Sequence, residues 1–382
     1  MSQNVTLPFD RCVQINLQSS LGGGEIYTAA VGRAMAAIGL PTEIVVHRDA
    51  TFWSRLDCGA ATFIPLARIA DLPNALSAGG RTLFIVHAGV DAQTMQGLRS
   101  QGNKVAAFAH MPYHERSPAL IRQADVVCAV SGYVLRTLKE KGVSNVFPEP
   151  FFGVADLQRK TGSTGEIRQG NEYDWDMRKF RDRVLSWVHP LIAGCRSTRI
   201  HVRRPGITLG LVSRITTIKQ FPELFACLTP VLLDFPQINI AVFGQGGYKS
   251  VRDLKRALAP LGERVAYWGH QSDVVSVYRS IDWLMSGLPE KEALGLNIIE
   301  AQTIGVPVLA VDAQPFSETV LDGVTGLRYA DPRFDAGAGF RAAIETIVAG
   351  GFSRDEAAAA QHLAKFSEAA FADRFRALIA SF

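Results

Sequence analysis

Two glutamates eight residues apart, Glu292 and Glu300, form the sequence pattern with the clearest chemical content. Gly295 lies between them, and Gly305 and Pro307 lie beyond them, at positions typical of the ends of a helix. We therefore expect a helix that begins just after Gly295 and ends near Gly305, followed by an apolar strand. Glu292 would lie in the loop before this helix and Glu300 near its first turn.

The start of this expected helix, at Leu296 and Asn297, has the properties of an anion-binding site. The first amides of a helix have no partner inside the helix, and they attract phosphate groups. Glu292 and Glu300 would lie on either side of these amides, where carboxylates can accept hydrogen bonds from hydroxyl groups. The pattern suits a ligand with phosphates in the middle and hydroxyl groups at both ends, such as a sugar nucleotide.

Two cations, Arg214 and Lys219, follow the expected strand 207–212. At the carboxyl end of a strand, cations five residues apart can converge on a pyrophosphate. Departure of a phosphate leaving group develops negative charge, and fixed cations can stabilise that charge without a metal ion. The alternative is a pair of solvated loop cations, but their combination with the glutamate pair favours the functional interpretation.

A glycine cluster at residues 22–24 follows the first expected strand, 12–17, and precedes a helix. Glycines let the backbone approach a ligand closely, and the start of the helix attracts anions. A dinucleotide-binding fingerprint needs G-x-G-x-x-G, and Tyr27 occupies its third glycine position. The second cluster, residues 244–247, fails in the same way at Lys249. An NAD-dependent oxidoreductase is therefore disfavoured.

Histidines lie at the ends of two expected strands in the first half of the chain. His110 follows 104–108, and His87 follows 82–86. A polar residue at the carboxyl edge of a parallel strand faces the ligand in folds of this type. His110 is the stronger candidate, and His87 and the nearby His114 are weaker ones. A histidine is often structural, and eight occur here, so both interpretations stay open.

Together these motifs resemble the E-x7-E element and its surroundings in retaining GT-B glycosyltransferases, in particular glycosyltransferase family 4. The resemblance covers most of the chain. It implies an α/β protein of two Rossmann-like domains facing across a cleft, with a C-terminal helix that crosses back to the first domain. The family often reads E-P-F-G-L where residues 292–296 read E-A-L-G-L, so the loss of the aromatic alters the sugar pocket. Glu318, before the turn 320–326, fits a further family glutamate, or orients loop backbone.

The resemblance also implies roles for individual residues. Glu292 and His110 would lie beside the reacting sugar, and Glu300 would bind the ribose. Arg214 and Lys219 would contact the donor diphosphate, so these two, His110 and Glu292 would be the catalytic residues. The residues implied in donor binding are Gly23, Gly24, Arg214, Lys219, Trp268, His270, Gly295, Leu296, Asn297 and Glu300, with Trp268 and His270 near the nucleotide base.

Strands and helices alternate in two runs, one in each half of the chain, which indicates two α/β domains with parallel sheets. We expect an N-terminal acceptor domain over 1–155 and a basic inter-domain insert over 156–205. A donor domain would follow over 206–365. The final segment, 366–382, has the spacing of an amphipathic helix, and the resemblance implies that it returns to the first domain.

The composition, 47% hydrophobic and 20% charged over 382 residues, is that of a globular protein with room for two domains. We recognise neither a secretory signal nor an apolar stretch long enough to span a bilayer. The five scattered cysteines lack a C-x-x-C pattern. We therefore expect a cytoplasmic protein with reduced thiols and no metal site. The net charge of +4 is too small to indicate nucleic acid.

The insert carries eleven basic and five acidic residues between positions 159 and 204. Within it, 178–191 has the spacing of a basic amphipathic helix. Two interpretations stay open: peripheral contact with the anionic inner face of a membrane, or packing on the protein itself with a solvated basic side. Residues 174–176 spell D-x-D, a metal-binding signature elsewhere, but no strand precedes them and we regard the match as coincidence.

The predicted function is that of a retaining, metal-independent glycosyltransferase of the hexosyltransferase type. Its donor would be a nucleotide diphosphate sugar, of the UDP or GDP type, and its acceptor a hydroxyl of a saccharide or lipid-linked molecule. No cofactor is implied, and polysaccharide or glycolipid synthesis is the expected context. Two alternatives remain: a non-catalytic scaffold that binds nucleotide sugar or glycan, and a sugar-nucleotide epimerase, which would form product without an acceptor.

Overall fold

The computed structural model describes residues 7–76, 80–88, 90–99, 102–155, 165–175, 180, 182–184, 186–187 and 199–382. The chain divides into two compact units. Unit 1 combines Met1–Val154 with Ala364–Phe382, and unit 2 is Ala155–Leu363. The basic insert, which the sequence prediction set apart from both domains, falls within unit 2.

Unit 1 contains a six-stranded sheet in the order β3-β2-β1-β4-β5-β6, and all of its paired strands are parallel. Its elements are β1 (Arg11–Asn16), α1 (Gly23–Ile38), β2 (Thr42–His47), η1 (Thr51–Arg55), β3 (Thr62–Leu66), η2 (Ile69–Asp71), α2 (Leu72–Ala75), β4 (Thr82–Ala88), α3 (Ala92–Leu98), β5 (Lys104–Ala109), η3 (Ile121–Gln123), β6 (Val126–Ala129), α4 (Gly132–Glu140), η5 (Ala364–Phe366) and α14 (Glu368–Ala380).

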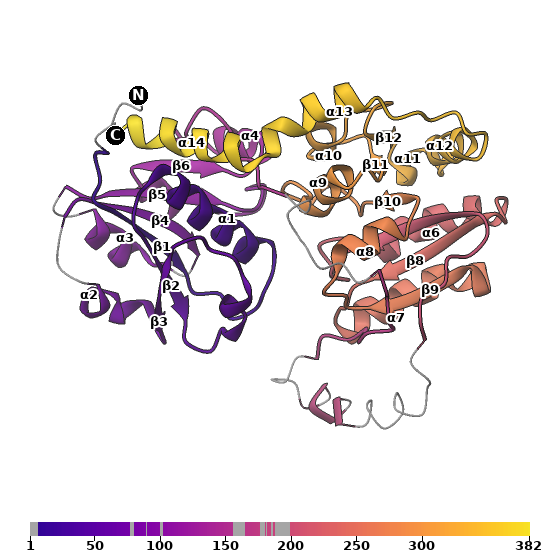
Figure 1. Cartoon of the computed structure of the whole chain (residues 1–382), viewed down its shortest axis with the longest axis horizontal. Helices are drawn as coiled ribbons and strands as arrows, with labels where there is room; N and C mark the ends of the chain where they lie inside the picture. The colour runs from indigo at the N-terminus through magenta and orange to yellow at the C-terminus, as the bar shows by residue number, and fades with distance from the viewer. Residues whose placement is uncertain are drawn as a thin grey trace. The chain divides into compact units, whose positions relative to one another are not determined.

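The last helix, α14, belongs to unit 1 and lies against α1, although most of the chain separates them (Figure 1). Its apolar face explains this position. The rings of Phe371 and Tyr27 pack edge to face at 5.3 Å, and the Phe375 ring lies 4.9 Å from that of Phe151. An ion pair from Arg33 to Glu368, at 2.7 Å, adds a polar contact at the rim. The burial of these aromatic rings accounts for the return of the chain to unit 1.

Unit 2 repeats the same parallel arrangement, in the order β12-β11-β10-β7-β8-β9. Its elements are β7 (Ile207–Val212), α6 (Phe221–Leu233), β8 (Ile238–Phe243), α7 (Tyr248–Leu258), η4 (Ala259–Arg264), β9 (Val265–Gly269), α8 (Val274–Arg279), β10 (Trp283–Met285), α9 (Leu296–Thr303), β11 (Val308–Val311), α10 (Phe316–Thr319), β12 (Gly326–Tyr329), α11 (Pro332–Asp335), α12 (Ala338–Val348) and α13 (Glu356–Leu363).

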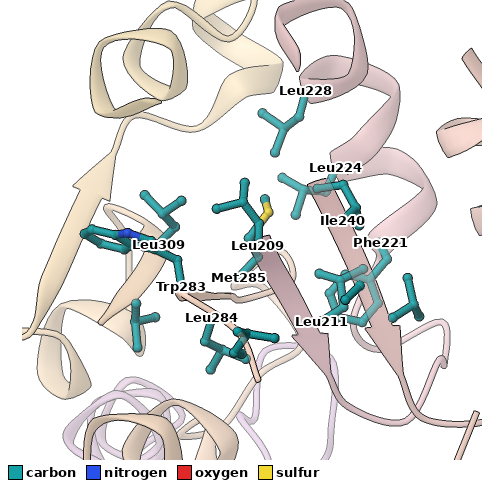
Figure 2. Close-up of a cluster of buried hydrophobic side chains, with 14 of the residues drawn as sticks. Leu209, Leu211, Phe221, Leu224, Leu228, Ile240, Trp283, Leu284, Met285 and Leu309 are labelled. Atoms are coloured by element: carbon teal, nitrogen blue, oxygen red, sulfur yellow. The ribbon is translucent and has the colours of Figure 1, made fainter. Parts of the chain in front are cut away.

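The core of unit 2 forms where helix side chains meet the central strands (Figure 2). Leu209 of β7 and Leu284 of β10 are fully buried, and Phe221 and Leu224 of α6 pack in the same cluster. Strands buried on both faces read as continuous apolar runs, which is why the sequence revealed them. Both sheets have the strand order of a Rossmann fold, so the predicted α/β architecture of two Rossmann-like domains is confirmed.

The strand order also locates the expected ligand positions. In such sheets, ligands bind beyond the carboxyl ends of the strands, where the order of connection reverses. This reversal lies between β1 and β4 in unit 1 and between β7 and β10 in unit 2. Within the described residues, no helix is both long enough and apolar enough to cross a membrane.

Candidate functional site

The loops at the carboxyl ends of the unit 2 strands are in direct backbone contact. A Cβ atom added to Gly244, after β8, would lie 1.9 Å from the carbonyl oxygen of Ser213, after β7. A Cβ atom on Gly287, after β10, would lie 2.1 Å from the carbonyl oxygen of Lys219. Only glycine permits such close approach. In addition, the Leu288 amide donates a hydrogen bond to the Lys219 carbonyl oxygen at 3.1 Å. The loops that carry the candidate residues are therefore held together.

The structure brings Lys219 and Glu292 together at the reversal point between β7 and β10. The ammonium group of Lys219 donates to Oε2 of Glu292, and the two side chains are only 20% and 14% exposed. Burial alone would raise the pKa of Glu292, but the charge of Lys219 and the amides of Ala293 and Leu294 outweigh it. The pKa of Glu292 is therefore below its ordinary value, and this carboxyl is ionised at neutral pH.

Helix α9 begins at Leu296, as the sequence predicted, and its first turn carries no side-chain cap. Gly295 precedes it with a φ of +83°, a conformation that favours glycine. Asn297 is anchored through its side chain, because Nδ2 donates to the carbonyl of Val212 at 3.1 Å. The start of α9 is thereby tied to the end of β7, beside the loop that leads to Lys219. This arrangement suits an anion at the helix start.

Glu300 is the fifth residue of α9, and its carboxylate accepts a hydrogen bond from a tyrosine that the sequence reasoning missed. The hydroxyl of Tyr278, in α8, lies 2.8 Å from Glu300 Oε2 and 3.2 Å from the carbonyl of Asn297. Tyr278 is fully buried. Its pKa is well above the ordinary value because of burial and the nearby carboxylate. Its sequence context, an apolar helix face, gave no signal beyond that of a core residue.

Arg214 lies in the same loop as Lys219 but has a more exposed environment. Its guanidinium forms an ion pair with Asp174 at 3.1 Å, and both side chains are about half exposed. Asp174 belongs to the D-x-D sequence, of which Asp176 lies outside the described residues. In the part of the chain that the structure describes, no three His, Cys, Asp or Glu residues are grouped to hold a metal.

The two residues assigned to the nucleotide base, Trp268 and His270, lie at the end of β9. Trp268 is 9% exposed, and its ring packs against His201 at 4.9 Å, so this side chain belongs to the core. His270 is exposed. Part of the basic insert covers this loop: the Gly170 amide donates to Trp268 O at 2.7 Å, and the His270 amide donates to Asn171 O at 2.8 Å. The insert therefore shapes the surroundings of the predicted base position.

In unit 1, His110 and His87 are in contact at the carboxyl ends of β5 and β4. His110 Nε2 lies 2.9 Å from His87 Nδ1. Burial lowers the pKa of His110 to about 4, and burial together with His110 lowers that of His87 well below its ordinary value. Both rings are therefore neutral at pH 7. His114 is exposed instead and pairs with the hydroxyl of Tyr133 at 2.7 Å.

The remaining candidates lie at the ends of helices. Gly23 and Gly24 are the first two residues of α1, which has no side-chain cap. A Cβ atom on Gly24 would meet nothing within 4 Å, so the protein itself does not require glycine there. Glu318 lies in the short helix α10.

The segment 178–191 falls mostly outside the described residues, but its Phe180 and Trp187 are 74% and 85% exposed.

Part of the chain is similar in sequence to known proteins. Residues 205–357 match the model of the family described as glycosyl transferases group 1. D-inositol 3-phosphate glycosyltransferase of Mycobacterium sp. (strain KMS) is 31% identical over 171 residues, which are 42% of this chain and 38% of that protein. LpsB, a lipopolysaccharide core biosynthesis mannosyltransferase of Rhizobium meliloti (strain 1021), is 37% identical over 68 residues, 18% of this chain and 19% of that protein. This chain therefore spans well under half the length of these relatives.

Solved structures resemble almost the whole chain. HepE of Anabaena, in complex with UDP, has a TM-score of 0.65 at 16% identity and covers 97% of this chain and 100% of its own. Sucrose-phosphate synthase from Thermosynechococcus elongatus has a TM-score of 0.67 at 19% identity, covering 98% and 100%. At such low identity the likeness concerns the fold alone. The chain thus has the GT-B fold, and residues 205–357 of unit 2 are similar in sequence to group 1 glycosyl transferases.

Proposed function

We propose that this protein is a retaining glycosyltransferase that uses a nucleotide diphosphate sugar. The observation that carries the proposal is the buried Lys219–Glu292 ion pair beside the uncapped start of α9. Both features lie within the segment that matches group 1 glycosyl transferases. The arrangement places a fixed cation, a carboxylate and helix amides at the reversal point of the sheet, where ligands of such folds bind.

In the reaction, the bond between the sugar C1 and the diphosphate oxygen breaks, and a bond from C1 to the acceptor oxygen forms on the same face. The acceptor hydroxyl gives its proton to the departing phosphate oxygen. Lys219, Arg214 and the amides of Leu296 and Asn297 stabilise the negative charge that develops on the diphosphate. The protein supplies these charges itself, so we propose metal-independent transfer.

The proposed donor contacts divide between the two glutamates. Glu292 orients the sugar, and its lowered pKa keeps it ionised and able to accept hydrogen bonds from sugar hydroxyls. Glu300, oriented by the Tyr278 hydroxyl, binds the ribose. We assign His110 and the start of α1, at Gly23, to the reacting sugar and the acceptor.

For the substrates, we propose a donor of the UDP or GDP type and a saccharide or lipid-linked acceptor in polysaccharide or glycolipid synthesis. A UDP-bound structural neighbour and a relative named as a lipopolysaccharide core mannosyltransferase support this choice. Peripheral contact with a membrane through the segment 178–191 is part of the same proposal. The exposed rings of Phe180 and Trp187 support it, because aromatic side chains insert at a membrane surface.

The test is a turnover assay. The wild-type protein and Glu292→Gln would be incubated with UDP- and GDP-sugars, with and without saccharide or lipid-linked acceptors, and products identified by mass spectrometry. We expect a glycosylated acceptor and free nucleoside diphosphate from the wild type, and strongly reduced amounts from the variant. Binding without turnover would instead support the scaffold, and an epimerised donor formed without acceptor would support the epimerase.

A further inference from the structure

Three hydrogen-bonded side chains run through unit 1 from its core to the carboxyl edge of its sheet. Gln14 of β1 is fully buried, His87 of β4 is 8% exposed, and His110 follows β5 and is partly exposed. The side-chain amide of Gln14 lies 3.0 Å from His87 Nε2, and His87 Nδ1 lies 2.9 Å from His110 Nε2. Three strands are thereby linked at the reversal point of the sheet.

An irregularity in the sheet coincides with the middle member of this chain. Ile15 of β1 pairs with Val86 of β4, but the next residue, Asn16, pairs with Ala88. His87 is therefore an extra residue in β4. Bulges of this kind re-aim a side chain, often next to a functional site. The bulge in β4 accounts for the contact of His87 with both Gln14 and His110.

The surroundings of Gln14 determine the direction of the hydrogen bonds. With its amide nitrogen toward His87, Gln14 donates to His87 Nε2 at 3.0 Å and to the Thr28 carbonyl at 3.1 Å, while its oxygen accepts from the Gly32 amide at 3.2 Å. The opposite orientation would place oxygen against a carbonyl and nitrogen against an N–H group. Only the first orientation satisfies all three neighbours, and a buried amide requires such satisfaction.

The orientation of Gln14 determines which nitrogen donates and which accepts in the next two hydrogen-bonding side chains. His87 accepts at Nε2, so in its neutral form its proton is on Nδ1, and this N–H donates to His110 Nε2. His110 then accepts at Nε2 and carries its own proton on Nδ1. The lowered pKa values of both rings agree with neutral imidazoles.

We propose that Gln14 and His87 are positioning residues that hold His110 in the tautomer with its proton on Nδ1. His110 therefore offers a hydrogen-bond donor, rather than an acceptor, to an oxygen of the bound sugar. The tautomer follows from unit 1 alone, whereas the identity of the oxygen rests on the proposed function.

The direct test is ¹⁵N NMR of the histidine side chains in the full-length protein at pH 7. We expect His110 to show a protonated Nδ1 and an unprotonated Nε2 in the wild type. His87→Phe and Gln14→Met keep the size of the side chain but remove a donor, so His110 should become a mixture of tautomers. His87→Asn is the matched control, because its side-chain amide can still donate from the Nδ1 position. A protonated Nε2 on His110 in the wild type would overturn the proposal.

Turnover supplies a second readout. His87→Phe should lower kcat about tenfold, the effect of one hydrogen bond of ordinary strength, while His87→Asn should largely restore it. Equal losses of kcat in His87→Phe and His87→Asn, with unchanged melting temperatures, would contradict a positioning role for His87. If His110 has the expected tautomer but no donor is turned over, the proposed function is wrong and the proposed hydrogen-bond chain is supported. If turnover occurs but His110 is in the other tautomer, the proposed hydrogen-bond chain is wrong and the proposed function is supported.

Discussion

The two units share one sheet topology but differ in what they place at the carboxyl edge. Unit 2 presents ions: the buried Lys219–Glu292 pair and the exposed Arg214–Asp174 pair. Unit 1 presents neutral polar groups, with His110 joined to a buried hydrogen-bond chain. The cations of unit 2 suit a diphosphate, its Glu292 suits sugar hydroxyls, and the neutral donors of unit 1 suit oxygen atoms of a sugar. The two units thus carry different kinds of side chain at the reversal point of one shared architecture.

The largest expected effect comes from Lys219→Ala. It removes a cation from the proposed diphosphate site, and we expect kcat to fall by about 100-fold or more. It also leaves the buried Glu292 unpaired, which should lower the free energy of unfolding by about 3 kcal/mol. Kinetics and urea denaturation would measure the two effects. Lys291→Ala, at an exposed position beside Glu292, is the control and should change neither. Wild-type turnover in Lys219→Ala would contradict the ionic role of unit 2.

A smaller effect is expected from Tyr278→Phe, which removes only the hydroxyl that donates to Glu300. Donor affinity should weaken about tenfold, because a hydrogen bond to a charged group is lost. The control is Tyr329→Phe, since the buried hydroxyl of Tyr329 has no hydrogen-bond partner among the described residues. Titration calorimetry with the donor nucleotide would measure both. Equal affinities for the two variants would show that Tyr278 does not act through Glu300.

The Arg214–Asp174 pair offers a contrast with the buried pair in the same unit. An exposed ion pair contributes about 0 to 1 kcal/mol to stability, so Asp174→Asn should hardly change the melting temperature. The variant should raise donor affinity about twofold, because the carboxylate no longer competes for the guanidinium. Donor affinity and melting temperature would be measured on the same samples. A clear loss of affinity would mean that Asp174 itself supports donor binding.

The last prediction concerns pH and unit 1. The pKa of His110 is about 4 when folded and near 6.5 when unfolded, so the unfolded state binds more protons between these values. Stability should therefore be complete above about pH 6.5 and decline as the pH falls toward 4. In His110→Gln this contribution disappears, so its melting temperature should fall less steeply than that of the wild type over that range. Parallel curves for the two proteins would contradict a lowered pKa of His110 in the folded state.

The sequence predicted the central strands well because they are buried on both faces and read as apolar runs. It missed β3 and β12, which are edge strands. β3 contains Pro65 and is largely exposed, and β12 contains Arg328, so neither has the pattern of a buried strand. These two strands are stabilised by the neighbouring strand rather than by their own periodicity, and a single sequence does not show that neighbour.

The candidate site was predicted unevenly for a related reason. Glu292 and Lys219 stood out because the glutamate pair brackets an expected helix start and the cations follow an expected strand, and the structure joins them. Gln14 and Tyr278 are fully buried polar residues in apolar surroundings, so the sequence could not separate them from core residues. Trp268 was assigned to the nucleotide base, but whether its aromatic ring faces a ligand or the core depends on His201, 67 positions earlier in the chain.

The most direct test of the central idea, that the carboxyl edge of unit 2 binds a nucleotide diphosphate sugar, is titration calorimetry. UDP, GDP and their common sugars would be titrated into the wild type and Glu300→Ala, without added divalent metal. We expect one nucleotide to bind the wild type, with binding lost or strongly weakened in Glu300→Ala. Failure of every nucleotide to bind the wild type, or equal binding to both proteins, would contradict a donor site at Lys219, Glu292 and Glu300.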